Sequence, residues 1–121
     1  MSIKGSTSVI ELYGIPNCDT VKKARLWLDG AGLAYTFHDY KKEGADPAKL
    51  AAWADAIGWE VLFNRRGTTF RALSDSDKAY IDRAKALALM AAHSSLIKRP
   101  VVEHPDGLLV GFVEGDWKAE L

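Results

Sequence analysis

Cys18 is the only cysteine among the 121 residues, and its surroundings favour a reactive thiol. The segment ELYGIPNCDT, residues 11–20, begins as a strand-like run, breaks at Gly14 and Pro16, and reaches Cys18 where a helical pattern starts. A lone cysteine more often behaves as a small apolar core residue. A polar, kinked approach followed by a helix start is a poor core position, so we expect a functional thiol here.

The chemistry of such a thiol depends on what stabilises its charge. In the first turn of a helix the backbone N–H groups lack intrahelical partners, and they and the helix dipole favour the thiolate. The dipole contributes only about 0.3–1 kcal/mol, so a nearby cation must help. Lys22 and Lys23 follow one turn later, with the Lys22 ammonium expected in water. Arg65, Arg66 and Arg99 are better candidates, because a permanently charged guanidinium fork also holds carboxylates and oxyanions.

Other kinds of site are not indicated. His38, His93 and His104 lack the spacing of metal ligands, so we interpret them as surface or structural residues and predict no metal site. Sixteen basic residues balance sixteen acidic ones, which argues against direct binding to nucleic acid or to a membrane surface.

The composition also suggests a compartment. The first residues, MSIKGSTSVI, have no apolar stretch typical of a signal peptide, and no run approaches the roughly 18 apolar residues of a membrane span. One cysteine cannot form an internal disulfide, which suits a reducing compartment. We therefore expect a cytoplasmic protein of one domain.

The elements that must position Cys18 follow from hydrophobic periodicity. Residues 8–13 are predicted to form a strand, Cys18 to about Ala31 a helix closed by Gly30 and Gly32, and Tyr35–Tyr40 a second strand. Short loops between them predict a right-handed crossover with parallel strands.

The remaining chain adds helices and a hairpin. Asp46 and Pro47 predict the start of a helix that ends at Gly58, and a loose capping box at Ser74 and Asp77 precedes a third helix with apolar positions from Tyr80 to Ala91. Strands at 96–102 and 108–112, joined by a turn at 104–107, predict a hairpin, and a short helix follows at 114–121. The sum is an α/β fold with a small mixed four-stranded sheet flanked by helices.

Four segments together resemble one family. YGIPNCDTVKKARLWL, FHDYKKEG, AIGWEVLFNRRGTTFRAL and LIKRPVV…LLVGF occur in the order found in the ArsC/Spx superfamily, and they are most similar to its YffB-like branch of arsenate-reductase-related proteins. The resemblance covers residues 9–121. It implies that residues 1–121 form a single thioredoxin-like domain with a helical insertion at about 46–94.

The resemblance also implies roles for individual residues. Cys18 matches the redox nucleophile, and Asn17 and Gly14 belong to its surroundings. Arg66 matches the basic residue of the loop that follows the first helix of the insertion, with Arg65 as the alternative register. Arg99 matches the arginine of an Arg-Pro motif, and Pro100 matches the proline that thioredoxin-like folds hold in the cis conformation beside the cysteine.

Three positions depart from the family pattern. Spx-like members with two cysteines carry Cys-x-x-Cys, whereas the second position is Val21 here, so an internal redox switch is excluded. Arsenate reductases have a third arginine where this chain has Gly111-Phe112, and a histidine where it has Gly14. One fewer cation and one fewer donor argue against arsenate as the substrate.

Two functions remain open at this point. The first is a glutathione-dependent thiol reductase, or arsenate-reductase-like oxidoreductase, that uses Cys18 alone. It needs no bound cofactor, takes glutathione or glutaredoxin as the thiol partner, and acts on a small-molecule or protein disulfide. The second is an Spx-like regulatory module that binds RNA polymerase or another protein without turnover.

Overall fold

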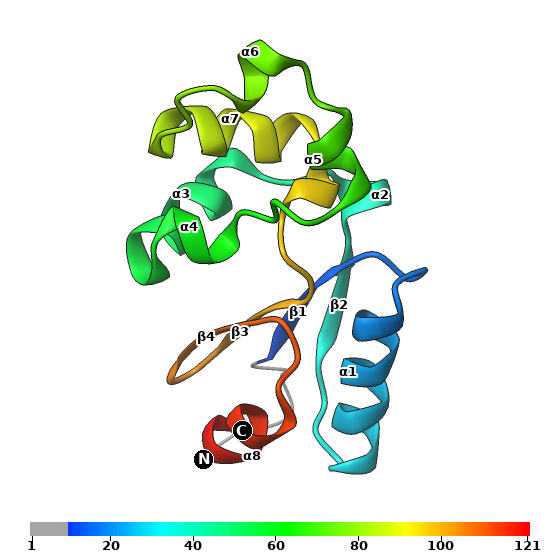
Figure 1. Cartoon of the computed structure of the whole chain (residues 1–121). Helices are drawn as coiled ribbons and strands as arrows, with labels where there is room; N and C mark the ends of the chain where they lie inside the picture. The colour runs from blue at the N-terminus through cyan, green and yellow to red at the C-terminus, as the bar shows by residue number, and fades with distance from the viewer. Residues whose placement is uncertain (1–9) are drawn as a thin grey trace. The chain divides into compact units, whose positions relative to one another are not determined.

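The computed structural model describes residues 10–121, so Ser8 and Val9 of the predicted first strand lie outside the described residues. The chain divides into two compact units. Of the described residues, the sheet unit contains 10–42 together with 99–121, and the helical unit contains 43–98 (Figure 1). Within the described part of the chain, no helix has the length and apolar character needed to span a bilayer.

The sheet unit is built on four short strands in the order β2-β1-β3-β4. β1 runs parallel to β2 and antiparallel to β3, and β3 runs antiparallel to β4, which confirms the predicted mixed sheet. The third strand begins at Val101 rather than at Leu96, because Leu96 belongs to a 3-10 turn and Pro100 has no N–H to donate to a ladder. The strands are β1 (Glu11–Gly14), β2 (Thr36–Asp39), β3 (Val101–His104) and β4 (Gly107–Val110).

Two helices of the sheet unit, α1 (Asp19–Gly30) and α8 (Glu114–Glu120), contribute to one hydrophobic core. α1 buries Val21, Ala24 and Leu28, whose helical spacing puts them on one side. α8 contributes Trp117, which is 1% exposed. From the sheet, this core takes alternate residues of three strands, namely Leu12, Val102 and Leu109.

The opposite face of the sheet carries polar side chains. Glu11 and Glu103 are cross-strand partners, and each carboxylate has its own hydrogen bond. The Tyr13 hydroxyl donates to Glu103 Oε1 over 2.9 Å, and His38 Nε2 lies 2.7 Å from Glu11 Oε1. The Tyr13 ring also stacks on His38 with 4.5 Å between centroids. These contacts offset the repulsion between two like charges placed side by side.

The helical unit follows the short helix α2 (Tyr40–Glu43). As predicted, α3 begins at Pro47 and is capped by Asp46, whose carboxylate accepts a hydrogen bond from the Ala48 N–H over 2.9 Å. An isolated bridge between Phe63 and Ile97 links the first half of the unit to its end. Its elements are α3 (Pro47–Ile57), α4 (Trp59–Leu62), α5 (Thr68–Ala72), α6 (Asp75–Lys78), α7 (Arg83–Ala92) and η2 (Ser94–Leu96).

The predicted third helix was wrong at its start. Ser74 does cap a helix, through a hydrogen bond from the Asp77 N–H of 3.1 Å, but that helix is the four-residue α6. Asp82 caps α7 separately by accepting from the Lys85 N–H over 2.9 Å. Tyr80 lies between them with φ +51° and is 98% exposed, so it belongs to neither helix. Two capping side chains in close succession start two helices where the apolar pattern suggested one.

Candidate active site

Cys18 lies at the N-terminus of α1. It is the N-cap residue, with extended backbone angles, and its carbonyl accepts the first intrahelical hydrogen bond from the Lys22 N–H over 2.9 Å. The thiol is free and the residue is half-buried. Asn17, which precedes it, is exposed. The sequence therefore placed the cysteine correctly at the helix start, one position before the first helical residue.

The hydrogen bond expected between the sulfur and the first-turn amides is not formed. The Cys18 side chain makes no capping hydrogen bond and instead packs against the core beneath α1. Packing of the side chain against apolar core residues takes the place of that hydrogen bond. The positive end of the helix dipole remains beside the thiol, whereas Asp19 adds an acidic side chain in the same turn.

Gly14 explains how closely the strand and helix approach each other. It is buried at the end of β1, and a Cβ built there would lie 2.9 Å from Val21 Cγ2. Real Cβ atoms do not come so close to a neighbour, and Val21 itself is fully buried. Gly14 and Val21 both depart from the family pattern, and in this structure they pack against each other.

The sheet register brings Pro100 to the same end of the sheet. Val101 pairs with Tyr13, so the preceding Arg99-Pro100 peptide lies beside the end of β1, from which the chain continues to Cys18. That peptide bond is cis, as the resemblance implied. The Pro100 carbonyl accepts a hydrogen bond from the Gly111 N–H over 2.8 Å, which ties β4 to this turn.

Arg99 is half-buried at this end of the sheet, close enough to Tyr40 to influence it electrostatically. Burial raises the pKa of the Tyr40 hydroxyl well above its usual range, Tyr13 and Glu103 act in the same direction, and Arg99 opposes them. The Tyr40 hydroxyl is buried without a hydrogen-bond partner among the described residues. Tyr40 thus stays neutral and carries no negative charge that could pair with Arg99. Sequence reasoning missed Tyr40, whose only signal was its place at the end of a predicted strand.

Arg65 and Arg66 belong to the helical unit, where both side chains are exposed. The Arg65 guanidinium lies 5.5 Å from the centroid of the Phe63 ring and 5.9 Å from that of Phe70. The Arg66 backbone N–H donates to Asn64 Oδ1 over 3.1 Å, but its guanidinium makes no hydrogen bond or ion pair within the described unit. Of the two, Arg66 has the free cationic group.

The three histidines have structural or surface positions. His38 pairs with Glu11, His93 is exposed beyond the end of α7, and His104 Nε2 lies 3.0 Å from Glu120 Oε1. Within residues 10–121, no group of three or more His, Cys, Asp or Glu side chains is arranged to hold a metal ion.

Several proteins of known sequence or structure are similar to this chain over nearly its whole length. The solved structure of a YffB protein is 51% identical, superposes with a TM-score of 0.90, and is matched over 93% of this chain and 98% of its own. A Haemophilus influenzae protein of uncharacterised function is 40% identical over 92% of this chain and 97% of its own length.

More distant relatives carry functional names. An arsenate reductase of Rhizobium meliloti is 31% identical over 81% of this chain and 71% of its own length. The global transcriptional regulator Spx 1 of Lactococcus lactis is 27% identical over 93% and 89%. The sheet, its flanking helices and these likenesses establish the thioredoxin-like ArsC fold. The model of the ArsC family matches residues 13–119, and the chain belongs to that family.

Proposed function

We propose that the protein is a glutathione-dependent thiol–disulfide oxidoreductase that uses Cys18 as its single nucleophile. The observation that carries the proposal is the half-buried free thiol at the N-terminus of α1, in a sequence with no second cysteine. Membership of the ArsC family and the relationship to an arsenate reductase support oxidoreductase chemistry.

The reaction proceeds by thiol–disulfide exchange. The Cys18 thiolate attacks a substrate disulfide, so that a bond forms between Cys18 and one substrate sulfur while the other sulfur leaves as a thiolate. A glutathione thiolate then displaces the bound substrate sulfur and remains attached to Cys18. A second glutathione attacks this adduct, which releases oxidised glutathione and regenerates the Cys18 thiolate. Two glutathione molecules are oxidised for each disulfide reduced.

Arginines have a role in this proposal as anion-binding groups. Arg99 lies at the end of the sheet next to the β1–α1 connection, and its charge is not neutralised by Tyr40. Arg66 has a free guanidinium in the helical unit. We assign Arg99 to stabilising the thiolate within the sheet unit, and Arg66 to binding an anionic group of glutathione, because charge-assisted hydrogen bonds contribute about 1.5–3 kcal/mol each.

The test combines adduct formation with turnover. After incubation with oxidised glutathione, mass spectrometry is expected to find one glutathione per chain, attached at Cys18. Disulfide reduction coupled to glutathione reductase is expected in the parent protein and to vanish in Cys18→Ser. Cys18 is also expected to react with an alkylating reagent at neutral pH faster than a free cysteine does. Reductase activity that survives in Cys18→Ser would rule the proposal out.

A second candidate is an Spx-like protein-binding module, which the similarity to Spx 1 favours. The absence of a second cysteine argues against a redox-switched regulator of that kind. The two functions predict opposite effects of Cys18→Ser. A module keeps its partner in a pull-down with this variant, whereas an oxidoreductase loses turnover. Arsenate reduction is a narrower form of the first function, tested by whether arsenate is consumed.

A further inference from the structure

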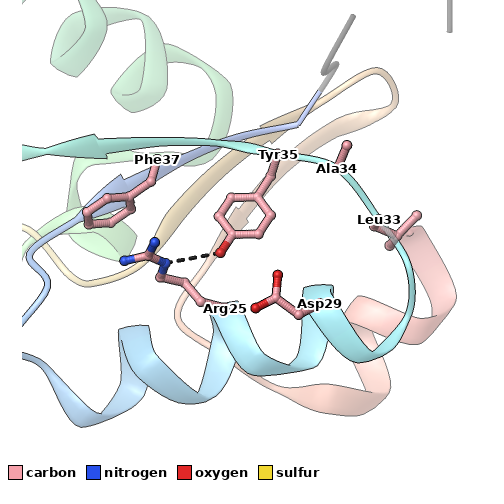
Figure 2. A pocket seen from close by; sticks show the side chains of 6 residues that line it. All are labelled: Arg25, Asp29, Leu33, Ala34, Tyr35 and Phe37. Carbon is pink, nitrogen blue, oxygen red and sulfur yellow. Dashed lines mark hydrogen bonds between the residues drawn. The ribbon is translucent and has the colours of Figure 1, made fainter. Parts of the chain in front are cut away.

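A groove runs along α1 on the side of β2. Two adjoining hollows make it, and they share Arg25, Asp29 and Tyr35. The larger hollow has a volume of about 450 Å³ and includes Phe37 and Leu33 (Figure 2). The smaller one adds Lys22 and Leu26 from the helix. The groove thus has an aromatic and aliphatic floor with charged groups along the helix wall.

The guanidinium of Arg25 is held in one orientation in this groove. Its Nε donates to the Tyr35 hydroxyl over 3.0 Å, and its guanidinium carbon lies 4.2 Å from the centroid of the Phe37 ring. Figure 2 shows the guanidinium between α1 and β2, with the two terminal nitrogens turned away from Tyr35. Those nitrogens make no hydrogen bond or ion pair with other described residues. A guanidinium oriented in this way is prepared to bind an anion with little further loss of entropy.

The groove is aligned with Cys18. Lys22, Arg25 and Asp29 follow the cysteine by four, seven and eleven residues, a spacing that puts all four positions on one side of a helix. At about 1.5 Å per residue, the Cα of Arg25 is about 10 Å and that of Asp29 about 16 Å from Cys18 along the axis. A ligand bonded to Cys18 that reaches Asp29 needs about five residues of extended chain, which exceeds a tripeptide.

We propose that this groove binds the polypeptide chain of a protein disulfide substrate, with acidic residues close to the reactive cysteine and a basic residue further along. The proposal rests on the oxidoreductase function of Cys18. Charge complementarity specifies the order, because Lys22 and Arg25 lie nearer the thiol and Asp29 lies further away. Leu33 and Phe37 supply apolar contact for the side chains between them.

The test uses two synthetic peptides whose single cysteine is joined in a disulfide to thionitrobenzoate. One carries glutamates next to the cysteine and a lysine further on, and in the other these residues are exchanged. Attack by Cys18 forms its bond to the peptide sulfur and releases coloured thionitrobenzoate. At low salt the parent protein is expected to react about fivefold faster with the glutamate-first peptide, a preference that salt removes.

Matched variants decide whether the groove is responsible. Lys22→Glu is expected to abolish or reverse the preference, and Lys23→Glu, which changes the neighbouring exposed lysine outside the groove, is expected to retain it. Equal rates with the two peptides, or equal effects of the two variants, would overturn the groove proposal while leaving the chemistry of Cys18 intact. Failure of Cys18 to react with any disulfide would instead contradict the proposed function.

A second measurement does not depend on the chemistry. Addition of the glutamate-first peptide, with serine in place of its cysteine, to the Cys18→Ser protein is expected to shift NMR amide signals in 22–29 and 33–37. Shifts confined to other segments, or none, would overturn the proposal. Shifts of these same signals on raising the protein concentration alone would identify a second copy of the chain as the occupant and also overturn it.

Discussion

Adjacent arginines at 65 and 66 differ in what their side chains contact. Arg65 lies against the faces of Phe63 and Phe70, whereas the Arg66 guanidinium is free within its unit. Exposed cation–π contacts contribute about 0.5–1 kcal/mol to stability, so Arg65 has a structural use that Arg66 lacks. This difference supports Arg66 as the anion-binding residue.

Single alanine substitutions should separate the two arginines. Arg66→Ala is expected to lower the rate of glutathione-dependent turnover at least tenfold without changing stability, because it removes only the charge-assisted hydrogen bond proposed to form with glutathione. Arg65→Ala is expected to reduce the free energy of unfolding by about 0.5–1 kcal/mol with little effect on turnover. Steady-state kinetics and urea denaturation of both variants provide the check. The reverse pattern would assign the anion-binding role to Arg65.

At Gly14, an added methyl group would collide with the buried side chain of Val21. Gly14→Ala brings a Cβ to within 2.9 Å of Val21 Cγ2, and overpacking of this kind costs about 1–3 kcal/mol. Denaturant unfolding of Gly14→Ala is expected to show that loss. The double variant Gly14→Ala/Val21→Ala should lose less than the sum of the two single changes, since Val21→Ala makes room. Strict additivity would show that the two side chains do not compete for the same space.

Among the elements, α8 buries one large side chain, Trp117, in the core of the sheet unit. Trp117 is almost fully buried, its Nε1 donates to the Gly111 carbonyl over 3.1 Å, and its ring packs edge-on against Phe112 and Trp27. Because this contact joins α8 to α1 and to the end of β4, its loss affects three elements of the sheet unit.

Trp117→Ala is expected to reduce the free energy of unfolding by about 3–5 kcal/mol, the usual cost of removing a large buried aromatic ring. Lys118→Ala is the matched control on the same helix. Its ammonium pairs with Glu114 over 3.4 Å at an exposed position, and such pairs contribute about 0.3–0.5 kcal/mol. Thermal unfolding of both variants gives the comparison. A small loss for Trp117→Ala would mean that α8 contributes little to the core.

At the scale of the whole molecule, the sequence predicted what depends on local pattern. The four strands, α1, α3 and α8 each have a regular apolar period or a recognisable cap, and all of them are present. The four- and five-residue helices α2, α4, α5 and α6 were missed as separate elements, because they are too short to show a helical period. Tyr80 was assigned to a helix because its apolar ring fitted the spacing, although it faces solvent.

The candidate site divides in the same way. The position of Cys18 and the cis bond before Pro100 could be predicted, since both accompany recognisable local motifs. The contact of Gly14 with Val21, and the groove around Arg25, depend on how β1, β2 and α1 pack together. No pattern along the chain records that packing. The sequence likewise could not tell Arg65 from Arg66, because the contacts of Arg65 with Phe63 and Phe70 depend on how the helical unit packs.

The space shared by Gly14 and Val21 also limits how this protein can have evolved. A lineage that acquires a larger residue at position 14 needs a smaller one at position 21 first, since the opposite order passes through a crowded intermediate. Descent between this chain and relatives with a histidine at position 14 therefore has a preferred order of substitutions. Where residue 14 becomes larger, reconstructed ancestors should contain the change at 21 before the change at 14, and where residue 14 becomes glycine, the change at 14 should come first.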